Sequence, residues 1–203
     1  MIIIDFFGFS GSGKSFLAKK ISDSHPEIDN QFLNISKSPK ILRLLKKIYY
    51  ISFIRIRDIS IILKIQNEFL FNTKKIKLKN LFSFMYLIGY IKSKSNKKKI
   101  LVLDHGFMQC FLSCFVYSKQ KNYNFIVITN LLSKIFLRLD NHYSYYNVIE
   151  MNHDWNLIKK RLINRDGSKS EKIFNDHKID FLNLCLNNCK TIYNNIENKK
   201  IQT

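Results

Sequence analysis

The stretch Gly-Phe-Ser-Gly-Ser-Gly-Lys-Ser occupies residues 8–15, between an apolar run at residues 2–7 and a segment with helical spacing at residues 16–21. It fits the phosphate-binding pattern G-x-x-x-x-G-K-[ST], placed between a strand and a helix. Gly8, Gly11 and Gly13 allow backbone conformations that a Cβ would block, so the amides between them can converge on phosphate groups. The sequence therefore predicts a nucleoside triphosphate site. The alternative is a glycine-rich turn that binds nothing.

Two residues of this loop have separate expected roles. Lys14 supplies positive charge to the β- and γ-phosphates, and Ser15 supplies a hydroxyl to Mg²⁺. The residues expected to contact the nucleotide are Gly8, Ser10, Gly11, Ser12, Gly13, Lys14, Ser15 and Phe16.

The composition predicts one folded domain with a strongly basic surface. The chain has 203 residues, of which 46% are hydrophobic, and it carries a net charge of +19. Such a length and hydrophobic content exclude a disordered chain. The charge indicates anionic partners, which are nucleotides, nucleic acid or an acidic membrane leaflet. Compositional drift in a chain rich in Lys, Asn and Ile explains it equally well.

Location is predicted from the apolar runs. The chain enters its first apolar run without a basic leader, and its longest uncharged apolar run, residues 81–91, is too short to span a bilayer. We expect a cytoplasmic protein.

Strand-like and helix-like segments alternate along the chain. We expect strands at residues 2–7, 32–35, 100–104, 147–151 and 200–202. We expect helices at residues 14–24, 107–117, 125–139, 155–163 and 175–196, and two or three more within 39–92, broken near 72–73 and 79–80. Residues 125–129 also suit a strand, but the spacing of Ile128, Leu132, Ile135 and Leu139 favours a helix. This alternation predicts an α/β fold with a parallel sheet and the phosphate loop at a strand's carboxyl end.

Asp104 follows the apolar run at residues 100–103. An acid at the carboxyl end of a core strand near a phosphate loop can hold Mg²⁺ or accept a proton from an attacking hydroxyl. The alternative is a residue that caps the next helix. The adjacent His105 is either a second base or substrate contact, or incidental.

Arg161 and Arg165 are four residues apart in a predicted helix, so both guanidiniums lie on one side of it. Small and polar residues follow at 166–170. Two arginines beside a mobile segment suit charge neutralisation on a transferring phosphoryl group, and we expect a lid at about residues 161–172. The alternative is a basic helix end in solvent.

The four cysteines form two pairs with helical spacing, Cys110 with Cys114 and Cys185 with Cys189. A four-thiolate metal site is geometrically conceivable. Both pairs fall on apolar stripes, which favours small buried hydrophobic residues in a reducing compartment.

The order of these features resembles the P-loop nucleoside and nucleoside-monophosphate kinase superfamily, above all its thymidylate kinase-like branch. The resemblance is carried by the phosphate loop, by Asp104-His105-Gly106 after an apolar strand, by the strand at 148–151 running into 152–155, and by Arg161-x-x-x-Arg165. It implies a three-layer α/β/α P-loop NTPase fold over residues 1–203, with a helical insertion at about 39–99. It also implies ATP and Mg²⁺ as cosubstrates, with Lys14 and Ser15 on phosphate and metal, Asp104 as the acid that also contacts the metal, and Arg161 and Arg165 in the lid.

The acceptor stays open, because residues 39–99 lack that branch's usual substrate-binding pattern. Arg55-Ile56-Arg57-Asp58 is the best candidate for gripping an anionic acceptor, and a basic helical face in solvent is its alternative. Residues 40–64 mix aromatic residues with cations and are also compatible with an acidic membrane surface.

Three classes of function follow from these patterns. The leading hypothesis is an ATP-dependent kinase that moves the γ-phosphate to a nucleoside, nucleotide or sugar-type hydroxyl or phosphate. A switch or motor ATPase is the second, although the chain has neither the Asn-Lys-x-Asp motif of GTPases nor the Leu-Ser-Gly-Gly-Gln signature of transporter ATPases. The third is a nucleotide-binding protein without kinase activity that acts on nucleic acid, a membrane surface or surface-polysaccharide synthesis. It draws on a looser similarity to kinase-like ATP-binding proteins encoded with bacterial polysaccharide enzymes.

Overall fold

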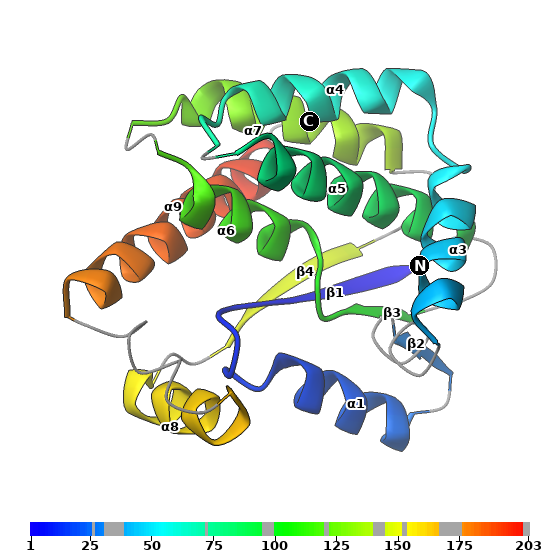
Figure 1. The fold of residues 1–203 in the computed structure, drawn as a ribbon. Helices are drawn as coiled ribbons and strands as arrows, with labels where there is room; N and C mark the ends of the chain where they lie inside the picture. Colours follow the sequence, from blue (N-terminus) through cyan, green and yellow to red (C-terminus); the bar gives the residue numbers. More distant parts are fainter. Residues whose placement is uncertain are drawn as a thin grey trace.

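A parallel sheet with helices on both faces forms the centre of the computed structural model (Figure 1). The structure describes residues 1–25, 27–30, 39–71, 73–94, 100–119, 122–139, 145–151, 154–166 and 176–200. Their strands are β1 (Ile2–Phe7), β2 (Ile28–Asn30), β3 (Ile100–Leu103) and β4 (Tyr145–Glu150). Their helices are α1 (Lys14–Ser24), α3 (Lys40–Ile51), α4 (Ile56–Asn67), α5 (Lys74–Lys94), α6 (Phe107–Tyr117), α7 (Phe125–Leu139), α8 (Trp155–Asp166) and α9 (Asp176–Lys200).

The strands lie in the order β2-β3-β1-β4 and every pair is parallel. Ile2 of β1 is opposite Ile100 on one side and Tyr145 on the other, so β1 is an interior strand. Parallel pairing needs a crossover between consecutive strands, and the helices supply it. The predicted α/β class with a parallel sheet is confirmed.

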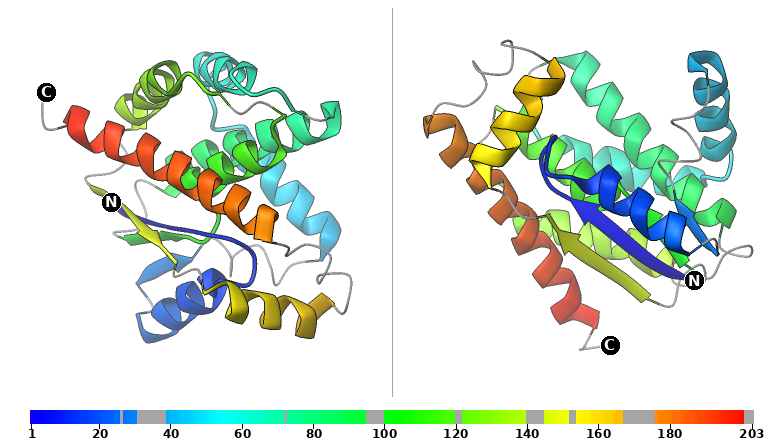
Figure 2. Two further views of the ribbon diagram at one scale, coloured as in Figure 1. Left: turned by 90° about the vertical axis from the view of Figure 1, so that its left-hand side faces the viewer. Right: turned by 90° about the horizontal axis from the view of Figure 1, so that it is seen from below.

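The sheet separates two unequal groups of helices. α1 and α8 lie on one side, while α5, α6 and α9 lie on the other, with α4 and α7 further out in the view of Figure 1 (Figures 1 and 2). Alternate residues of β1 pack on opposite faces of the sheet. Ile3 and Phe7 join the large core with the second group, whereas Phe6 packs with Ala18 and Val102 in a small cluster beside α1. This arrangement is compatible with three layers, α/β/α.

Most predicted elements agree with the structure. The strand at 2–7 and the helices at 14–24, 107–117 and 125–139 are confirmed, and a strand at 125–129 is wrong. The predicted strand at 100–104 ends at Leu103, β4 begins at Tyr145, α8 continues to Asp166, and α9 includes Lys200. The predicted strand at 32–35, the lid beyond Asp166 and residues 201–202 lie outside the described residues.

The helical middle is divided between α4 and α5 near the predicted break at 72–73, but it differs from the prediction at two other places. α5 runs through Asn80 without a break, because Asn80 is buried and its Oδ1 accepts a hydrogen bond from Ser113 Oγ of α6 at 3.0 Å. The chain turns instead after Ile51, where Ser52 Oγ donates to Tyr49 O at 2.7 Å. Asp58 then starts α4 by accepting the Arg55 backbone N–H at 3.2 Å. Polar side chains at these positions therefore serve tertiary contacts and a helix start.

Among the described residues, we find no helix with both the length and the apolar content needed to cross a bilayer.

Candidate functional site

The loop between β1 and α1 has a backbone that only glycine adopts without strain. Gly11 has φ of 88° and Gly13, which precedes α1, has φ of 98°. A Cβ at Gly11 would also lie 3.2 Å from Leu162 Cγ of α8. The backbone angle therefore requires glycine at residue 11, and the packing against α8 leaves little room for a side chain.

Lys14 lies in the first turn of α1 and turns back over the loop. Its Nζ donates to Gly8 O at 2.6 Å and to Phe9 O at 2.9 Å. Burial lowers the pKa of Lys14 to about 8, and the nearby Asp104 carboxylate opposes part of that shift. A phosphate group would compensate the buried ammonium better than two neutral carbonyls do.

Ser15 and Asp104 meet although 89 positions separate them in the chain: Ser15 Oγ donates to Asp104 Oδ2 at 3.0 Å. β3 pairs directly with β1, and Leu103 of β3 lies opposite Asp5 of β1. Asp104, the next residue after Leu103, therefore lies at the same edge of the sheet as the start of the phosphate loop. Burial raises the pKa of Asp104, and the hydrogen bond from Ser15 and the charge of Lys14 lower it in part. The neighbouring His105 is exposed as a residue, but desolvation of its imidazole and the charge of Lys14 lower the pKa of His105 to about 4.

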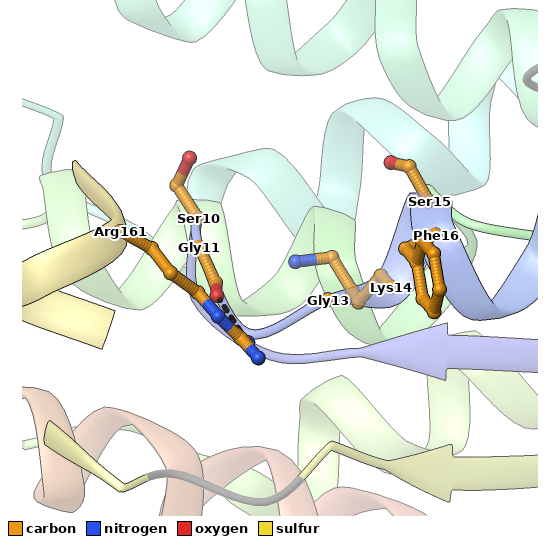
Figure 3. A pocket seen from close by; sticks show the side chains of 7 residues that line it. All are labelled: Ser10, Gly11, Gly13, Lys14, Ser15, Phe16 and Arg161. Atoms are coloured by element: carbon orange, nitrogen blue, oxygen red, sulfur yellow. Dashed lines mark hydrogen bonds between the residues drawn. The ribbon is translucent and has the colours of Figure 1, made fainter. Parts of the chain in front are cut away.

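Arg161 reaches the loop from α8. Its Nη1 donates to Gly11 O at 3.1 Å (Figure 3). Together with loop residues it lines a cavity of about 500 Å³, whose lining is Ser10, Gly11, Gly13, Lys14, Ser15, Phe16 and Arg161 (Figure 3). Phe16 is 75% exposed beside the cavity, which leaves its ring free to contact a base. Arg165 lies in α8, but its side chain is outside the described part of the structure.

Two predicted loop residues are set back from this cavity. Ser12 is buried and its backbone N–H donates to Phe9 O at 3.1 Å, which closes the turn. The Gly8 N–H donates to Gln109 Oε1 of α6 at 3.2 Å. Gln109 thus holds the start of the loop, and nothing in its local sequence signals that role.

Asp5 is a second residue that the sequence analysis missed. Its buried carboxylate accepts hydrogen bonds from the Tyr146 hydroxyl and from the Met108 backbone N–H, the latter at 3.1 Å. A Cβ at Gly106 would lie 2.2 Å from Asp5 Cγ, so the turn after Asp104 closes directly over this carboxylate. Burial raises the pKa of Asp5 to about 6. The sequence feature that could have revealed the role of Asp5 is its position as the only carboxylate within the apolar run 2–7.

The loop also contacts the only tryptophan of the chain. The rings of Phe9 and Trp155 have centroids 5.3 Å apart, and Trp155 Nε1 donates to Asn183 Oδ1 of α9 at 3.2 Å. We therefore expect a change in the loop to alter the surroundings of the Trp155 ring.

Arg55 and Arg57 lie far from this site. They line a second cavity of about 400 Å³ with Phe53, Asp58, Lys92 and Arg138. Lys92 and Arg138 lie near the ends of α5 and α7, shortly before β3 and β4 begin, so this cavity is at the amino-terminal edge of the sheet. The phosphate loop follows the carboxyl end of β1. Arg55 and Arg57, predicted to grip an anionic acceptor, therefore lie at the edge of the sheet opposite the phosphate loop.

Asp58 is the acid that pairs with two cations of that second cavity. Lys92 Nζ and Arg138 Nη1 both form ion pairs with its carboxylate. Burial raises the pKa of Asp58, but the hydrogen bonds and charges of Lys92 and Arg138 hold it below its usual value. The acid therefore ties α4 to α5 and α7.

All four cysteines are buried, on α6 and α9, which pack together. Burial raises the pKa of each thiol, which favours its neutral form. Within the described ranges no group of three or more His, Cys, Asp or Glu residues is arranged to hold a metal. Mg²⁺ does not require such a group, because it commonly uses one or two protein oxygens with phosphate and water.

No protein-family model, curated protein or solved structure matches this chain. The residues of the site thus carry the functional inference by themselves.

Proposed function

We propose that the protein is an ATP-dependent kinase that transfers the γ-phosphate to a small-molecule hydroxyl or phosphate. The observation that carries the proposal is the hydrogen bond from Ser15 to Asp104, because Ser15 lines one cavity with Lys14 and Arg161. A glycine-rich turn without a ligand would have no need for an acid from another strand at this position.

The loop supplies the groups that a triphosphate needs. Backbone amides near the start of α1 face anionic charge favourably, and the helix dipole adds to them. On binding, the Lys14 ammonium would exchange the Gly8 and Phe9 carbonyls for phosphate oxygens. Arg161 would add a second cation from the opposite wall of the cavity.

Ser15 and Asp104 fit Mg²⁺ because they offer two oxygen atoms 3.0 Å apart, next to the cavity that Ser15 lines. When bound, the ion neutralises charge on the β- and γ-phosphates. Alternatively, Asp104 accepts the proton of an acceptor hydroxyl without holding the ion, because burial raises its pKa and makes it a better proton acceptor. Transfer rather than binding alone is supported by this acid and by Arg161, which is placed to stabilise charge on a moving phosphoryl group.

Binding is tested with matched variants on one helix. Lys14→Ala should weaken MgATP binding by at least about a hundredfold, because it removes the buried ammonium. Lys20→Ala removes an equal charge from the exposed side of α1 and should leave affinity unchanged. Calorimetry, or Trp155 fluorescence, gives both dissociation constants. Equal affinities for the two variants would exclude the loop as the nucleotide site.

Transfer is tested by a screen for acceptor-dependent ADP release over nucleosides, nucleotides and sugars. Asp104→Asn keeps the shape of the side chain and should lower the rate by about 10²-fold or more. Release of ADP that no acceptor stimulates would instead assign the protein to the ATPase class.

A further inference from the structure

α3 is an amphipathic helix whose apolar side faces outward. Six residues of this helix are large, apolar or aromatic, and between 48% and 75% exposed: Ile41, Leu42, Leu44, Leu45, Ile48 and Tyr49. At 3.6 residues per turn their positions fall on one continuous side. Phe53 extends this side, because it is 40% exposed and its ring centroid lies 5.2 Å from that of Tyr49. We call these seven residues the α3 face.

The orientation of α3 is set by its contacts with α5. The Tyr50 ring packs against Tyr86 and Tyr90, with centroid distances of 5.8 and 4.9 Å. The helices approach so closely that a Cβ at Gly89 would lie 1.9 Å from Tyr50 O. Lys47 Nζ lies 5.9 Å from the centroid of the Tyr86 ring. Rotating α3 to bury its leucines would break this set of contacts.

The cations of α3 occupy the sides of the helix away from the α3 face, the division of residues found in helices that lie on membrane surfaces. α3 contains Lys40, Arg43, Lys46 and Lys47 and no acidic residue. Arg55 and Arg57 follow, and the sequence has no acid between Asp29 and Asp58. With a net charge of +19, a second copy of the chain would bring like charges together at this surface. An anionic surface with an apolar interior would pair with the cations and bury the leucines.

We propose that the α3 face docks the protein on an anionic lipid bilayer. Leucine, isoleucine and aromatic side chains enter the boundary between head groups and acyl chains, while the exposed Lys47, Arg55 and Arg57 attract anionic head groups. In Figures 1 and 2, α3 stands at the end of the sheet away from the phosphate loop. Docking therefore leaves the cavity at Lys14 and Arg161 open to solvent.

The test is cosedimentation of the full chain with vesicles, using two matched double variants. Leu45→Gln with Ile48→Gln alters the α3 face, where these side chains are 57% and 55% exposed. Leu137→Gln with Ile126→Gln makes the same chemical change on α7, at 65% and 73% exposure. The first pair should weaken binding to vesicles of phosphatidylcholine and phosphatidylglycerol at least about tenfold, and the second should not. Binding should fall with salt and be lost on phosphatidylcholine alone.

Three results would overturn the proposal. One is equal vesicle binding by the two double variants. Another is a wild-type dimer in sedimentation equilibrium that the α3 variant alone dissociates, which would assign the face to a second copy. The third is a fall in melting temperature of more than about 5 °C in the α3 variant alone, which would mean that the face is covered within the chain. Because MgATP affinity should be the same in both double variants, failure here is distinguishable from failure of the kinase proposal.

Discussion

Lys14 would make the proposed nucleotide binding depend on pH. Its pKa is lowered to about 8 chiefly by burial, so the ammonium begins to lose its proton in the mildly alkaline range. A bound triphosphate favours the charged form and raises that pKa again. Binding then requires proton uptake above about pH 8, and affinity falls as pH rises.

We therefore expect the affinity for MgATP to be flat from about pH 7 to pH 8 and then to fall by up to about tenfold per pH unit. Lys14→Arg keeps its charge throughout and should bind more weakly but without this fall. Dissociation constants from Trp155 fluorescence between about pH 7 and pH 10 measure both profiles. A wild-type profile that parallels that of Lys14→Arg would contradict the assignment of Lys14 to the phosphates.

Asp5 links folding to pH in the acidic range. Its pKa is raised from 3.8 to about 6, mainly by burial and against the hydrogen bonds from Tyr146 and Met108. The folded state thus binds this proton more tightly than the unfolded state does. The resulting contribution to stability is fully present below about pH 4 and is lost as pH rises through about 6, by an amount on the order of 3 kcal/mol.

Asp5→Asn removes this titration while keeping an oxygen that accepts the Met108 N–H. Relative to wild type, the variant should gain stability as pH is raised from about 4 to 7. Urea unfolding at several pH values gives the difference, and Asp23→Asn, on the exposed side of α1, is the control. A stability difference between Asp5→Asn and wild type that does not change with pH would show that Asp5 carries no raised pKa.

At the scale of elements, the packing of α3 on α5 depends on one missing side chain. Gly89 is helical, and replacing an open helical glycine with alanine normally stabilises a protein by about 1 kcal/mol. Here the added Cβ would meet the backbone of Tyr50, which cannot move aside as a flexible side chain would.

Gly89→Ala should therefore destabilise the protein by about 1–3 kcal/mol, because the two helices must separate. Chemical denaturation measures the free energy of unfolding. A more stable variant would mean that α3 does not pack at Gly89, and the orientation of the α3 face would then lose its support.

At the scale of the whole molecule, the two proposed activities occupy opposite ends of the sheet. The phosphate loop, Asp104 and Arg161 meet where the parallel strands end, while α3 and the second cavity lie near where strands begin. A protein docked through α3 would thus present its nucleotide cavity away from the bilayer. In these two proposals, basic residues of the α3 region contact the bilayer, while the phosphate loop contacts the nucleotide.

Local patterns in the sequence were sufficient to predict the glycine-rich turn after β1, β1 itself and the helices α1, α6 and α7. The signals for these elements lie within a few neighbouring residues. The same patterns indicated that Ser15 and Asp104 belong near one sheet edge. Local reasoning failed at Asn80, where a polar residue bonds to Ser113 on another helix and leaves α5 unbroken.

The sequence by itself determined the α/β class and the glycine-rich turn between β1 and α1. Only the tertiary structure decided that Asp104 reaches Ser15, that Asp5 and Gln109 support the loop, and that Arg55 and Arg57 lie at the far edge. It also decided that α3 turns its leucines outward. The physical reason is that helical periodicity depends on neighbouring residues, whereas the direction a face takes depends on contacts such as Tyr50 with Gly89, made by residues far apart in the chain.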